Sequence, residues 1–290
     1  MKCLVTGGAG FVGTNLIKRL LKDGYEVVSV DNYSIGKKEN EQDGCKYYEI
    51  DLSDKVSIDS LESIRTVSQI PKFDVIFHLA AKARIVPSIE NPLKSLNNNI
   101  NSTINILEYA RKNNTSVVYA GSSSAHGDIY ANPYTFTKWN GEELCKLYSN
   151  VYDLPIAICR FYNVYGDGQL SEGAYCTVLG IFERQWRAGE KCTVVSPGSQ
   201  TRDFTHINDV VNGLIKIAKR DDDYEWHLRS GINVDIVTVA EMFGEWELIP
   251  MRRGERFTSE EFPSDTEERL GWKPTHKLEE WIKYVKKDGR

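Results

Sequence analysis

The sequence lacks a membrane-length apolar run, a cysteine pattern and an excess of basic residues. No stretch approaches the ~18 continuous apolar residues of a membrane span, and "TGGAG" at 6–10 interrupts the apolar N-terminal segment, which argues against a signal peptide. The six cysteines show no C-x-x-C or Cys/His spacing, so we expect reduced thiols, no disulfide framework and no metal site. The formal net charge of -5 argues against a nucleic-acid partner. These absences together predict a cytoplasmic protein that binds neither membrane nor nucleic acid.

What the sequence does contain is a regular alternation of short apolar runs and longer amphipathic segments. The apolar runs lie at 2–7, 25–31, 45–51, 73–81, 115–122 and 154–163. Segments with helical spacing, such as "TNLIKRLLKDG" and "NSTINILEYARKNN", lie between them. This alternation is typical of repeated βαβ units, so we expect an α/β fold with a Rossmann-type doubly wound parallel sheet. Ligands of such sheets bind outside the carboxyl ends of the strands.

The first apolar run leads into a glycine pattern, "VTGGAGFVG" at 5–13, that opens a helical segment. Gly7, Gly10 and Gly13 stand where a phosphate loop needs a tight turn, a close approach of backbone to pyrophosphate and close packing of helix on strand. Alone, such a triplet is also compatible with an ordinary turn. Asp31 follows the second run, where a carboxylate accepts hydrogen bonds from ribose hydroxyls and repels a 2′-phosphate. The set predicts a dinucleotide site that prefers NAD, while the lysines at 37 and 38 leave NADP open.

Beyond Asn163 the pattern changes to loops, glycines and scattered aromatics between helical stretches. We expect residues 1–162, together with about 206–226, to form an NAD-binding Rossmann domain. Residues from about 163 to 205 and from 227 to 290 are then expected to form a smaller, mixed α/β substrate-binding lobe.

A tyrosine and a lysine lie four residues apart in "YANPYTFTK" at 130–138, and "SSS" at 122–124 precedes them. Asn132 and Pro133 supply a cap and a first-turn proline, so Tyr134 and Lys138 are expected on one face of a helix. A free tyrosine has a pKa of about 10, but a lysine ammonium and an oxidised nicotinamide nearby would each lower it by on the order of one unit. Such a phenolate takes a proton from a sugar hydroxyl and later returns it. The alternative is that Tyr134 packs, Lys138 is solvated and the serines form a turn.

These motifs, in this order and spacing, resemble the extended short-chain dehydrogenase/reductase family, and within it the NAD-dependent nucleotide-sugar epimerases and dehydratases. The resemblance covers nearly the whole chain and rests on "TGGAGFVG", "DNYSIGKKEN", "HLAA", "NPLKSLNNNINSTINILE", "SSSAHGD", the Tyr/Lys pair, "RFYNVYGDGQ", "QTRDFTHINDV" and "LGWKP". It implies that Tyr134 is the catalytic acid/base, that Lys138 holds the nicotinamide ribose and lowers the pKa of the tyrosine, and that Ser122 is the catalytic Ser/Thr.

The resemblance also implies two sets of binding residues. Those expected to bind NAD are Gly7, Gly10, Phe11, Val12, Gly13, Asp31, Asn32, Asp51, Leu52, Leu79, Ala80, Ala81 and Lys138. Those expected to bind the sugar nucleotide are Lys82, Ser123, Asn163, Arg202 and Arg252. A guanidinium meets phosphate oxygens bidentately, which suits the two arginines to the diphosphate, although a surface salt bridge is the alternative for each of them.

The residues after Ser122 separate the reactions of this family. Dehydratases carry Asp-Glu there and decarboxylases carry a Glu at the second position, whereas this chain has Ser123 and Ser124. The resemblance therefore implies a 4-epimerase similar to UDP-glucose 4-epimerase, which acts on a UDP- or GDP-sugar through a transient 4-keto sugar. A nucleotide-sugar 4,6-dehydratase and a 4-ketoreductase stay open as alternatives. So does a dinucleotide-binding sensor or scaffold that has kept the fold without the chemistry.

The chain departs from the family pattern in two places near the expected site. His126 stands where the family has Tyr, and the segment between Gly127 and Tyr134 is shorter than usual. The missing segment lies beside the sugar in the family, so we expect its loss to open the pocket or to change what covers it.

The resemblance further implies a homodimer that forms through two helices, at about 99–112 and about 134–150. An apolar face on these segments includes Ile104, Leu107, Leu144 and Leu147. Such a face is compatible with a dimer interface and equally with ordinary core packing.

Overall fold

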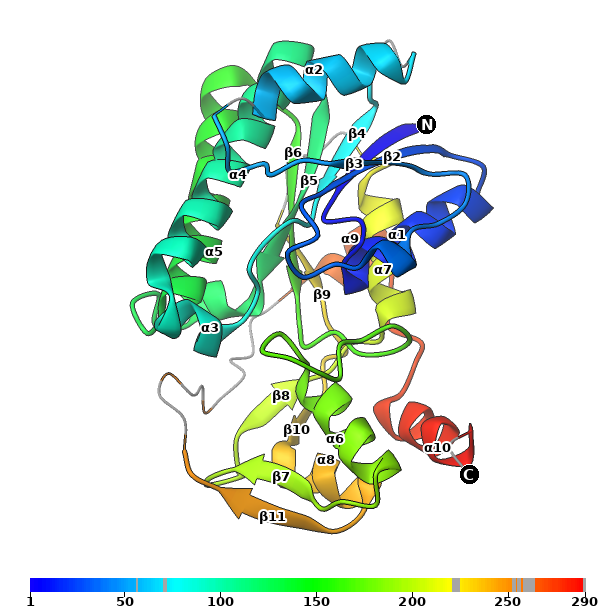
Figure 1. Ribbon diagram of the computed structural model, residues 1–290, viewed down its shortest axis with the longest axis vertical. Coiled ribbons are helices and arrows are strands. Elements are labelled where there is room, and N and C mark those ends of the chain that lie inside the picture. Colours follow the sequence, from blue (N-terminus) through cyan, green and yellow to red (C-terminus); the bar gives the residue numbers. More distant parts are fainter. Residues whose placement is uncertain are drawn as a thin grey trace.

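The computed structural model describes residues 1–55, 57–69, 72–220, 225–251, 254, 257 and 264–288. Its larger part is a seven-stranded sheet with the order β3-β2-β1-β4-β5-β6-β9 (Figure 1). Every neighbouring pair in this sheet is parallel. The strands are β1 (Lys2–Thr6), β2 (Glu26–Asp31), β3 (Lys46–Glu49), β4 (Val75–His78), β5 (Ser116–Ser122), β6 (Ile156–Phe161) and β9 (Glu225–Leu228). Each of the six apolar runs forms a strand, and the Rossmann-type α/β fold is confirmed.

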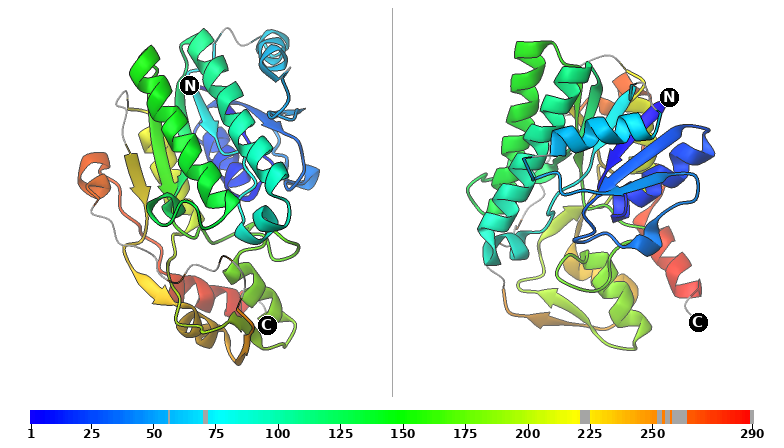
Figure 2. Two further views of the ribbon diagram at one scale, coloured as in Figure 1. Left: turned by 90° about the vertical axis from the view of Figure 1, so that its left-hand side faces the viewer. Right: turned by 45° about the horizontal axis from the view of Figure 1, so that its top comes forward.

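Helices cover both faces of this sheet. One face is covered by α1 (Phe11–Lys22) and α7 (Ile207–Ile217), and the other by α2 (Ser57–Val67), α4 (Pro92–Asn113) and α5 (Pro133–Tyr152). Figure 2 shows α4 and α5 lying side by side along the sheet. Each strand contributes side chains to both faces, because successive residues point to opposite sides of the sheet. Cys3 and Val5 of β1 lie in one apolar core, and Leu4 lies in the other.

The helix that carries the Tyr/Lys pair begins as the sequence predicts. Asn132 caps α5 by accepting the main-chain N–H of Thr135 at 2.9 Å, and Pro133 occupies the first turn. Three short helices follow strands of the sheet: η1 (Lys38–Asn40) after β2, α3 (Ile85–Glu90) after β4 and η2 (Ser123–His126) after β5. The start of α5 is tied to α3, because Ser88 Oγ accepts the main-chain N–H of Tyr134 at 3.2 Å.

A smaller part of the chain lies beyond the carboxyl ends of the strands (Figure 1). Its elements are α6 (Val178–Arg187), β7 (Cys192–Val195), β8 (Thr201–Asp203), β10 (Asn233–Asp235), α8 (Ile236–Phe243), β11 (Trp246–Ile249) and α10 (Leu278–Asp288). β10 pairs antiparallel with β8, and β11 pairs parallel with β7. These elements surround an apolar core of their own, which contains Phe182, Val194, Phe243 and Ile282.

The division into an NAD-binding domain and a substrate-binding lobe stays a proposal, and the packing supports one change to it. The proposed lobe includes α9 (Thr266–Leu270), yet Leu270 and Trp272 pack in the core between the sheet, α1 and α7. Trp272 also donates its indole N–H to the carbonyl of Asp209 in α7 at 2.9 Å. We therefore propose that residues 225–228 and 264–272 belong with the larger part.

A buried ion pair joins α5 to β6, the strand beside β9 at one edge of the sheet. Arg160 in β6 donates to Glu142 Oε2 in α5, through Nε at 3.0 Å and through Nη2 at 2.7 Å. Glu142 Oε1 accepts the main-chain N–H of Ser122, at the end of β5, at 3.2 Å. Burial raises the pKa of Glu142, and the Arg160 guanidinium opposes that rise. The pair therefore sets the position of α5 relative to the end of β5.

Replacing the acid of this pair tests its structural role. Glu142→Ala is expected to lower the free energy of unfolding by about 3 kcal/mol, because Arg160 stays buried without its main partner. Urea denaturation followed by circular dichroism measures this change. The matched control is Glu143→Ala, since Glu143 pairs with Lys146 at the surface and its loss is expected to cost less than about 1 kcal/mol. Equal losses in the two variants would contradict the role assigned to the buried pair.

Candidate active site

A cavity of about 770 Å³ opens at the carboxyl ends of the strands, between the sheet and the smaller part of the chain. Its lining includes the loops that follow β1, β2, β3, β4, β5 and β6 and, on the other side, residues of α6, β8 and the loop before α6. The volume is in the usual range for cofactor and substrate sites. A parallel sheet is expected to bind its ligands at this edge.

The glycine loop between β1 and α1 forms a cradle at one end of the cavity. Gly7 has a φ of 71°, in the left-handed region, and a Cβ on it would stand 2.9 Å from the main-chain nitrogen of Ala80. A Cβ on Gly13 would stand 2.2 Å from the carbonyl oxygen of Gly7, so α1 lies too close to the loop for a larger residue. The N-cap residue of α1 is Gly10, so no side chain at that position accepts a hydrogen bond from the first N–H groups of the helix. The cradle and the helix N-terminus beside it fit the pyrophosphate of a dinucleotide.

Asp31 ends β2 with a buried carboxylate at the cavity wall. It accepts the main-chain N–H groups of Ala9 at 3.0 Å and of Tyr33 at 2.8 Å, which orient its oxygens. Burial raises the pKa of Asp31, and these two hydrogen bonds oppose the rise. Asp51 follows the neighbouring strand and accepts the side-chain amide of Asn32 at 2.9 Å. Two carboxylates at this edge suit the unphosphorylated ribose of NAD.

The structure brings together every residue that the sequence predicts to bind NAD. The cavity is lined by Gly7, Gly10, Phe11, Val12, Gly13, Asp31, Asn32, Asp51, Leu52, Leu79, Ala80, Ala81 and Lys138. These residues come from five separate segments of the chain, so only the folded sheet gathers them. Their individual contacts with the cofactor stay predictions.

Tyr134 and Ser122 meet at the other end of the cavity. Tyr134 lies in the first turn of α5 and donates its hydroxyl to Ser122 Oγ at 3.3 Å. Ser122 Oγ also accepts the main-chain N–H of Ser124 at 3.2 Å, where η2 follows β5. Both hydroxyls line the cavity. A bound molecule that places one oxygen between them could exchange a proton with Tyr134.

Lys138 lies one turn further along α5 and is buried, so the alternative of a solvated lysine is wrong. Its ammonium donates to the carbonyl of Ala120 at 2.9 Å and lies 5.3 Å from the centre of the Tyr119 ring. Burial lowers the pKa of Lys138 to about 8, although the charge of Glu142 opposes this fall. The cavity thus holds a cation that keeps its charge at neutral pH and loses it as the pH rises past about 8.

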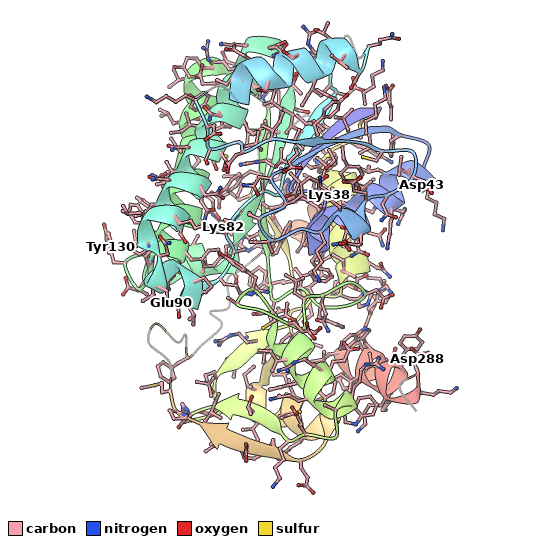
Figure 3. All side chains as sticks on the ribbon, in the orientation of Figure 1. Lys38, Asp43, Lys82, Glu90, Tyr130 and Asp288 are labelled. Carbon is pink, nitrogen blue, oxygen red and sulfur yellow. The ribbon has the colours of Figure 1, made fainter. Side chains whose placement is uncertain are left out.

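Lys82 lies nearer to the cofactor end than a sugar ligand is expected to lie. Its ammonium contacts Ser34 Oγ and is 5.9 Å from the centre of the Tyr175 ring. Burial lowers the pKa of Lys82, and the carboxylates of Asp31 and Asp51 oppose the fall. Figure 3 labels Lys82 on the side of the larger part that faces the smaller one. These neighbours favour a contact with the dinucleotide over a contact with the sugar.

The other expected substrate ligands lie where the two parts of the chain face each other. Asn163 follows β6 with a φ of 22° and donates its side-chain amide to the carbonyl of Asp203 at 2.9 Å. Arg202 in β8 donates Nη1 to the carbonyl of the residue before it at 2.8 Å. Both line the cavity, and so does Ser123. Arg252 lies outside the described residues.

Two charged residues of the site were not expected from the sequence. Glu142 lies four residues after Lys138, so the helical spacing could have indicated it. Arg84 lines the cavity but belongs to no recognisable pattern. Its hydrogen-bond acceptors include the carbonyls of residues 175 and 176, which only the fold brings near.

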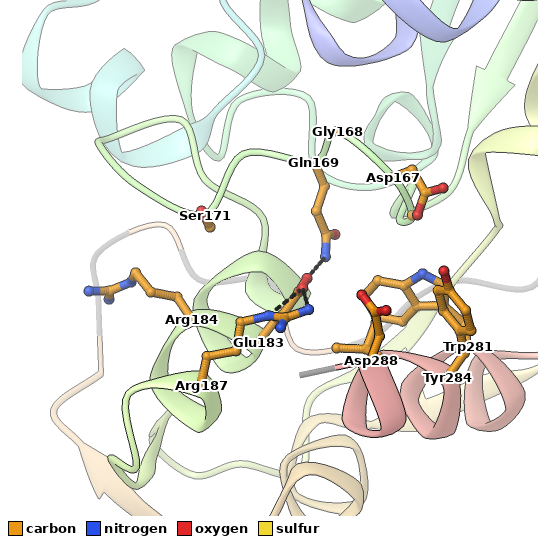
Figure 4. A pocket seen from close by; sticks show the side chains of 12 residues that line it. Asp167, Gly168, Gln169, Ser171, Glu183, Arg184, Arg187, Trp281, Tyr284 and Asp288 are labelled. Carbon is orange, nitrogen blue, oxygen red and sulfur yellow. Dashed lines mark hydrogen bonds and ion pairs between the residues drawn. The ribbon is translucent and has the colours of Figure 1, made fainter. Parts of the chain in front are cut away.

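A second cavity of about 510 Å³ lies between the loop at 166–171, α6 and α10 (Figure 4). Two of its charges pair with each other, since Glu183 accepts from Arg187 at 3.0 Å, and Glu183 also accepts from the Gln169 side-chain amide at 3.1 Å. The three residues expected to be catalytic, all of which the structure describes, line the first cavity and not this one. We assign the chemistry to the first cavity.

Three further observations bear on the expected absences. Within the described ranges, no group of three or more His, Cys, Asp or Glu side chains is arranged to hold a metal ion. No helix in the same ranges combines the length and apolar composition needed to cross a membrane. The six cysteines are free thiols, and four of them are buried.

A dinucleotide cradle that shares its cavity with a tyrosine–serine pair defines an NAD-dependent enzyme of the short-chain type. The chain belongs to the NAD dependent epimerase/dehydratase family, whose model matches residues 3–227, so the resemblance seen in the sequence is confirmed. It is 30% identical to a Methanocaldococcus jannaschii protein provisionally named UDP-glucose 4-epimerase, over 97% of this chain and 96% of that one. It is 28% identical to UDP-glucuronic acid decarboxylase 1 of Danio rerio, over 97% of this chain and 71% of that one. The structure of UDP-glucose 4-epimerase from Thermotoga maritima with UDP-glucose matches it with a TM-score of 0.90 at 26% identity, over 100% of both chains.

The buried ammonium of Lys138 predicts a pH dependence of stability. The pKa of Lys138 is about 8 in the folded protein, whereas a lysine in an unfolded chain has a pKa of about 10.4. Between about pH 8 and pH 10.4 the unfolded chain binds more protons than the folded protein. The free-energy cost of burying the ammonium is therefore present below about pH 8 and is relieved as the pH rises. The free energy of unfolding is expected to gain about 3 kcal/mol from this group across that window.

Lys138→Met removes this contribution, so its unfolding free energy is expected to rise less between about pH 8 and 10 than that of the wild type. Urea denaturation at a series of pH values, without added nucleotide, measures the difference. Lys22→Met serves as the control, because Lys22 is exposed at the end of α1. The same slope in the wild type and in Lys138→Met would refute a buried ammonium at this position.

Proposed function

We propose that the chain is an NAD-dependent epimerase of a nucleotide-diphosphate sugar, acting at C4 through a transient 4-keto sugar. The observation that supports this most is the hydrogen bond from Tyr134 to Ser122 in a cavity that also contains the glycine cradle and the buried Lys138. The relatives named for UDP-glucose favour a UDP-sugar as substrate, with a GDP-sugar as the alternative.

Tyr134 is the proposed acid and base of the reaction. Bound NAD supplies a centre that accepts a hydride and gives it back. Tyr134 removes the proton of the 4-hydroxyl while the C4–H bond breaks, and Ser122 holds the same oxygen through its hydroxyl. The positive charge of Lys138 stabilises the phenolate form of the tyrosine. After the 4-keto sugar has turned its other face to the site, Tyr134 returns the proton to the oxygen and the C4 epimer results.

The residues after Ser122 support epimerisation over dehydration or decarboxylation. Eliminating water across C5 and C6 requires an added acid and base. Here the two following side chains are the hydroxyls of Ser123 and Ser124, and Ser124 Oγ lies 2.8 Å from Ser122 Oγ. Neither side chain is ionisable near neutral pH. A 4-ketoreductase would use the same catalytic residues and differs in consuming reduced cofactor.

The short segment between Gly127 and Tyr134 supports a pocket with a different cover. Tyr130 in this segment is 79% exposed and lies at the outer edge of the molecule (Figure 3). The cavity is lined instead by residues 173–178, from the loop that leads into α6. We propose that this loop, rather than the shortened segment, covers the sugar.

Replacing Tyr134 tests the chemistry. Tyr134→Phe is expected to lower kcat by about 10²- to 10⁴-fold, because the variant has no group to accept or return the proton. The matched control is Tyr130→Phe, which alters an exposed tyrosine outside the cavity and is expected to keep the activity. Nuclear magnetic resonance of the products of UDP-glucose and UDP-galactose, with NADH absorbance recorded in parallel, gives the readout.

Three outcomes would count against the proposal. A persistent 4-keto-6-deoxy product would assign the chain to the dehydratases, and stoichiometric consumption of NADH would assign it to the reductases. Binding of NAD without binding of any sugar nucleotide in calorimetry would favour a sensor or scaffold. Interconversion of C4 epimers without net NADH release supports the epimerase.

We also propose that the chain forms a homodimer through α4 and α5. Leu147 and Val151 are 52% and 58% exposed on α5. Leu107, by contrast, is buried in the core, and Leu144 packs partly against it, so the apolar face seen in the sequence is divided between core and surface.

A charge on this surface tests the dimer. Leu147→Glu is expected to convert the dimer to a monomer, because two like charges would face each other across a two-fold interface. Light scattering coupled to size-exclusion chromatography measures the mass. A monomeric wild type would overturn the proposal.

A further inference from the structure

Arg84 is held rigidly at the wall of the cavity. It lies at the start of α3 and donates Nε to the carbonyls of Tyr175 at 3.0 Å and Cys176 at 3.1 Å. Its Nη1 donates to the carbonyl of Ala83 at 2.9 Å. Three main-chain carbonyls therefore fix the plane of the guanidinium, one from the preceding residue and two from residues 175 and 176. A surface arginine would rotate freely.

No carboxylate among the described residues is paired with Arg84. No described residue of any kind accepts a hydrogen bond from its Nη2. Burial lowers the pKa of Arg84, and the neighbours that oppose the fall are the phenol of Tyr134 and the thiol of Cys176. Arg160, which is buried, has Glu142 and Glu225 as partners, whereas Arg84 is half-buried. Even partial removal of a guanidinium from water is unfavourable unless something supplies a negative charge beside it.

The position of Arg84 indicates which part of a substrate would supply that charge. The phenol of Tyr134 is among the electrostatic neighbours of Arg84, and Ser88 in the same helix accepts the main-chain N–H of Tyr134, so Arg84 lies at the end of the cavity that holds Tyr134. The diphosphate is expected further away, at Asn163 and Arg202, which the smaller part of the chain positions. The group near Arg84 is therefore on the sugar itself. In a hexose that reacts at C4, the neighbouring carbon C5 carries the C6 group, and C6 is a carboxylate in a uronic acid.

We propose that Arg84 binds a carboxylate on the sugar, so that the substrate is a nucleotide-diphosphate uronic acid rather than a neutral hexose. The inference rests on the proposed function, because it takes Tyr134 to mark the reacting end. The two N–H groups of Nη2 and the remaining one of Nη1 are available to a carboxylate, and a planar guanidinium meets both of its oxygens. Arg84 is then a specificity-determining residue for the reaction.

The test compares two substrates that differ only at C6, namely UDP-glucuronate and UDP-glucose, with the full chain loaded with NAD. The wild type is expected to show a kcat/KM for UDP-glucuronate that is higher by about 100-fold or more. Arg84→Gln is expected to lower kcat/KM for UDP-glucuronate by about 100-fold more than kcat/KM for UDP-glucose, since only the charged sugar loses an ionic partner. Arg84→Lys is expected to recover part of the loss, because it restores the charge without the planar fork. Arg187→Gln, which changes an arginine paired with Glu183 outside this cavity, is the control.

The outcomes separate this inference from the proposed function. If neither UDP-sugar reacts or binds in calorimetry, this inference fails, and the proposed function is left with a GDP-sugar as its substrate. If both bind without turnover, a loss of affinity in Arg84→Gln for UDP-glucuronate alone supports the carboxylate site, and equal affinities overturn it. If UDP-glucose reacts as readily as UDP-glucuronate in the wild type, the inference fails while the epimerase stands. If Arg84→Gln slows both sugars equally and shifts the pH–rate profile, Arg84 acts on Tyr134 and the inference is overturned.

Discussion

The buried pair of Arg160 and Glu142 is the constraint on which the rest of the site depends. Two charges removed from water are tolerated only where their geometry is satisfied, so the pair fixes one point of α5 against β6. The same carboxylate accepts the N–H of Ser122, which fixes the end of β5. Tyr134 and Lys138 share a helix face with Glu142, and they take their places from it. The tyrosine therefore meets the serine because a third residue, remote from the chemistry, sets the helix.

Three cations near the site, the buried Arg160 and Lys138 and the half-buried Arg84, have three different kinds of neighbour. Arg160 is neutralised by carboxylates and serves the fold. Lys138 has carbonyl and aromatic neighbours, and its pKa falls toward neutrality, which suits a residue that acts on the charge of a phenol. Arg84 is oriented by main-chain carbonyls yet lacks an acid among the described residues. A charge that the chain positions but does not neutralise is one that a ligand can neutralise.

The chain belongs to the NAD dependent epimerase/dehydratase family, and every residue expected to bind NAD lies in the lining of the cavity. The sugar half of the cavity is where the chain departs from the family pattern. The segment before Tyr134 is short, and the loop that leads into α6 forms the wall instead. That loop supplies the carbonyls of Tyr175 and Cys176 that hold Arg84. We therefore propose that the cover of the sugar and the orientation of Arg84 depend on the same loop.

The sequence by itself determined the sheet, the glycine cradle and the Tyr/Lys pair. Each of these depends on local spacing: alternating apolar runs for the strands, close glycines for the turn, and an i, i+4 step on a capped helix. Tertiary structure alone decided the surroundings of Lys82 and Arg84 and the packing of Trp272 on the larger part. Burial and charge pairing depend on neighbours far along the chain, such as residues 91 positions from Arg84, and no local pattern records them. The residues expected to react are therefore indicated by local sequence patterns, whereas the side chains that surround a sugar depend on where distant segments come together.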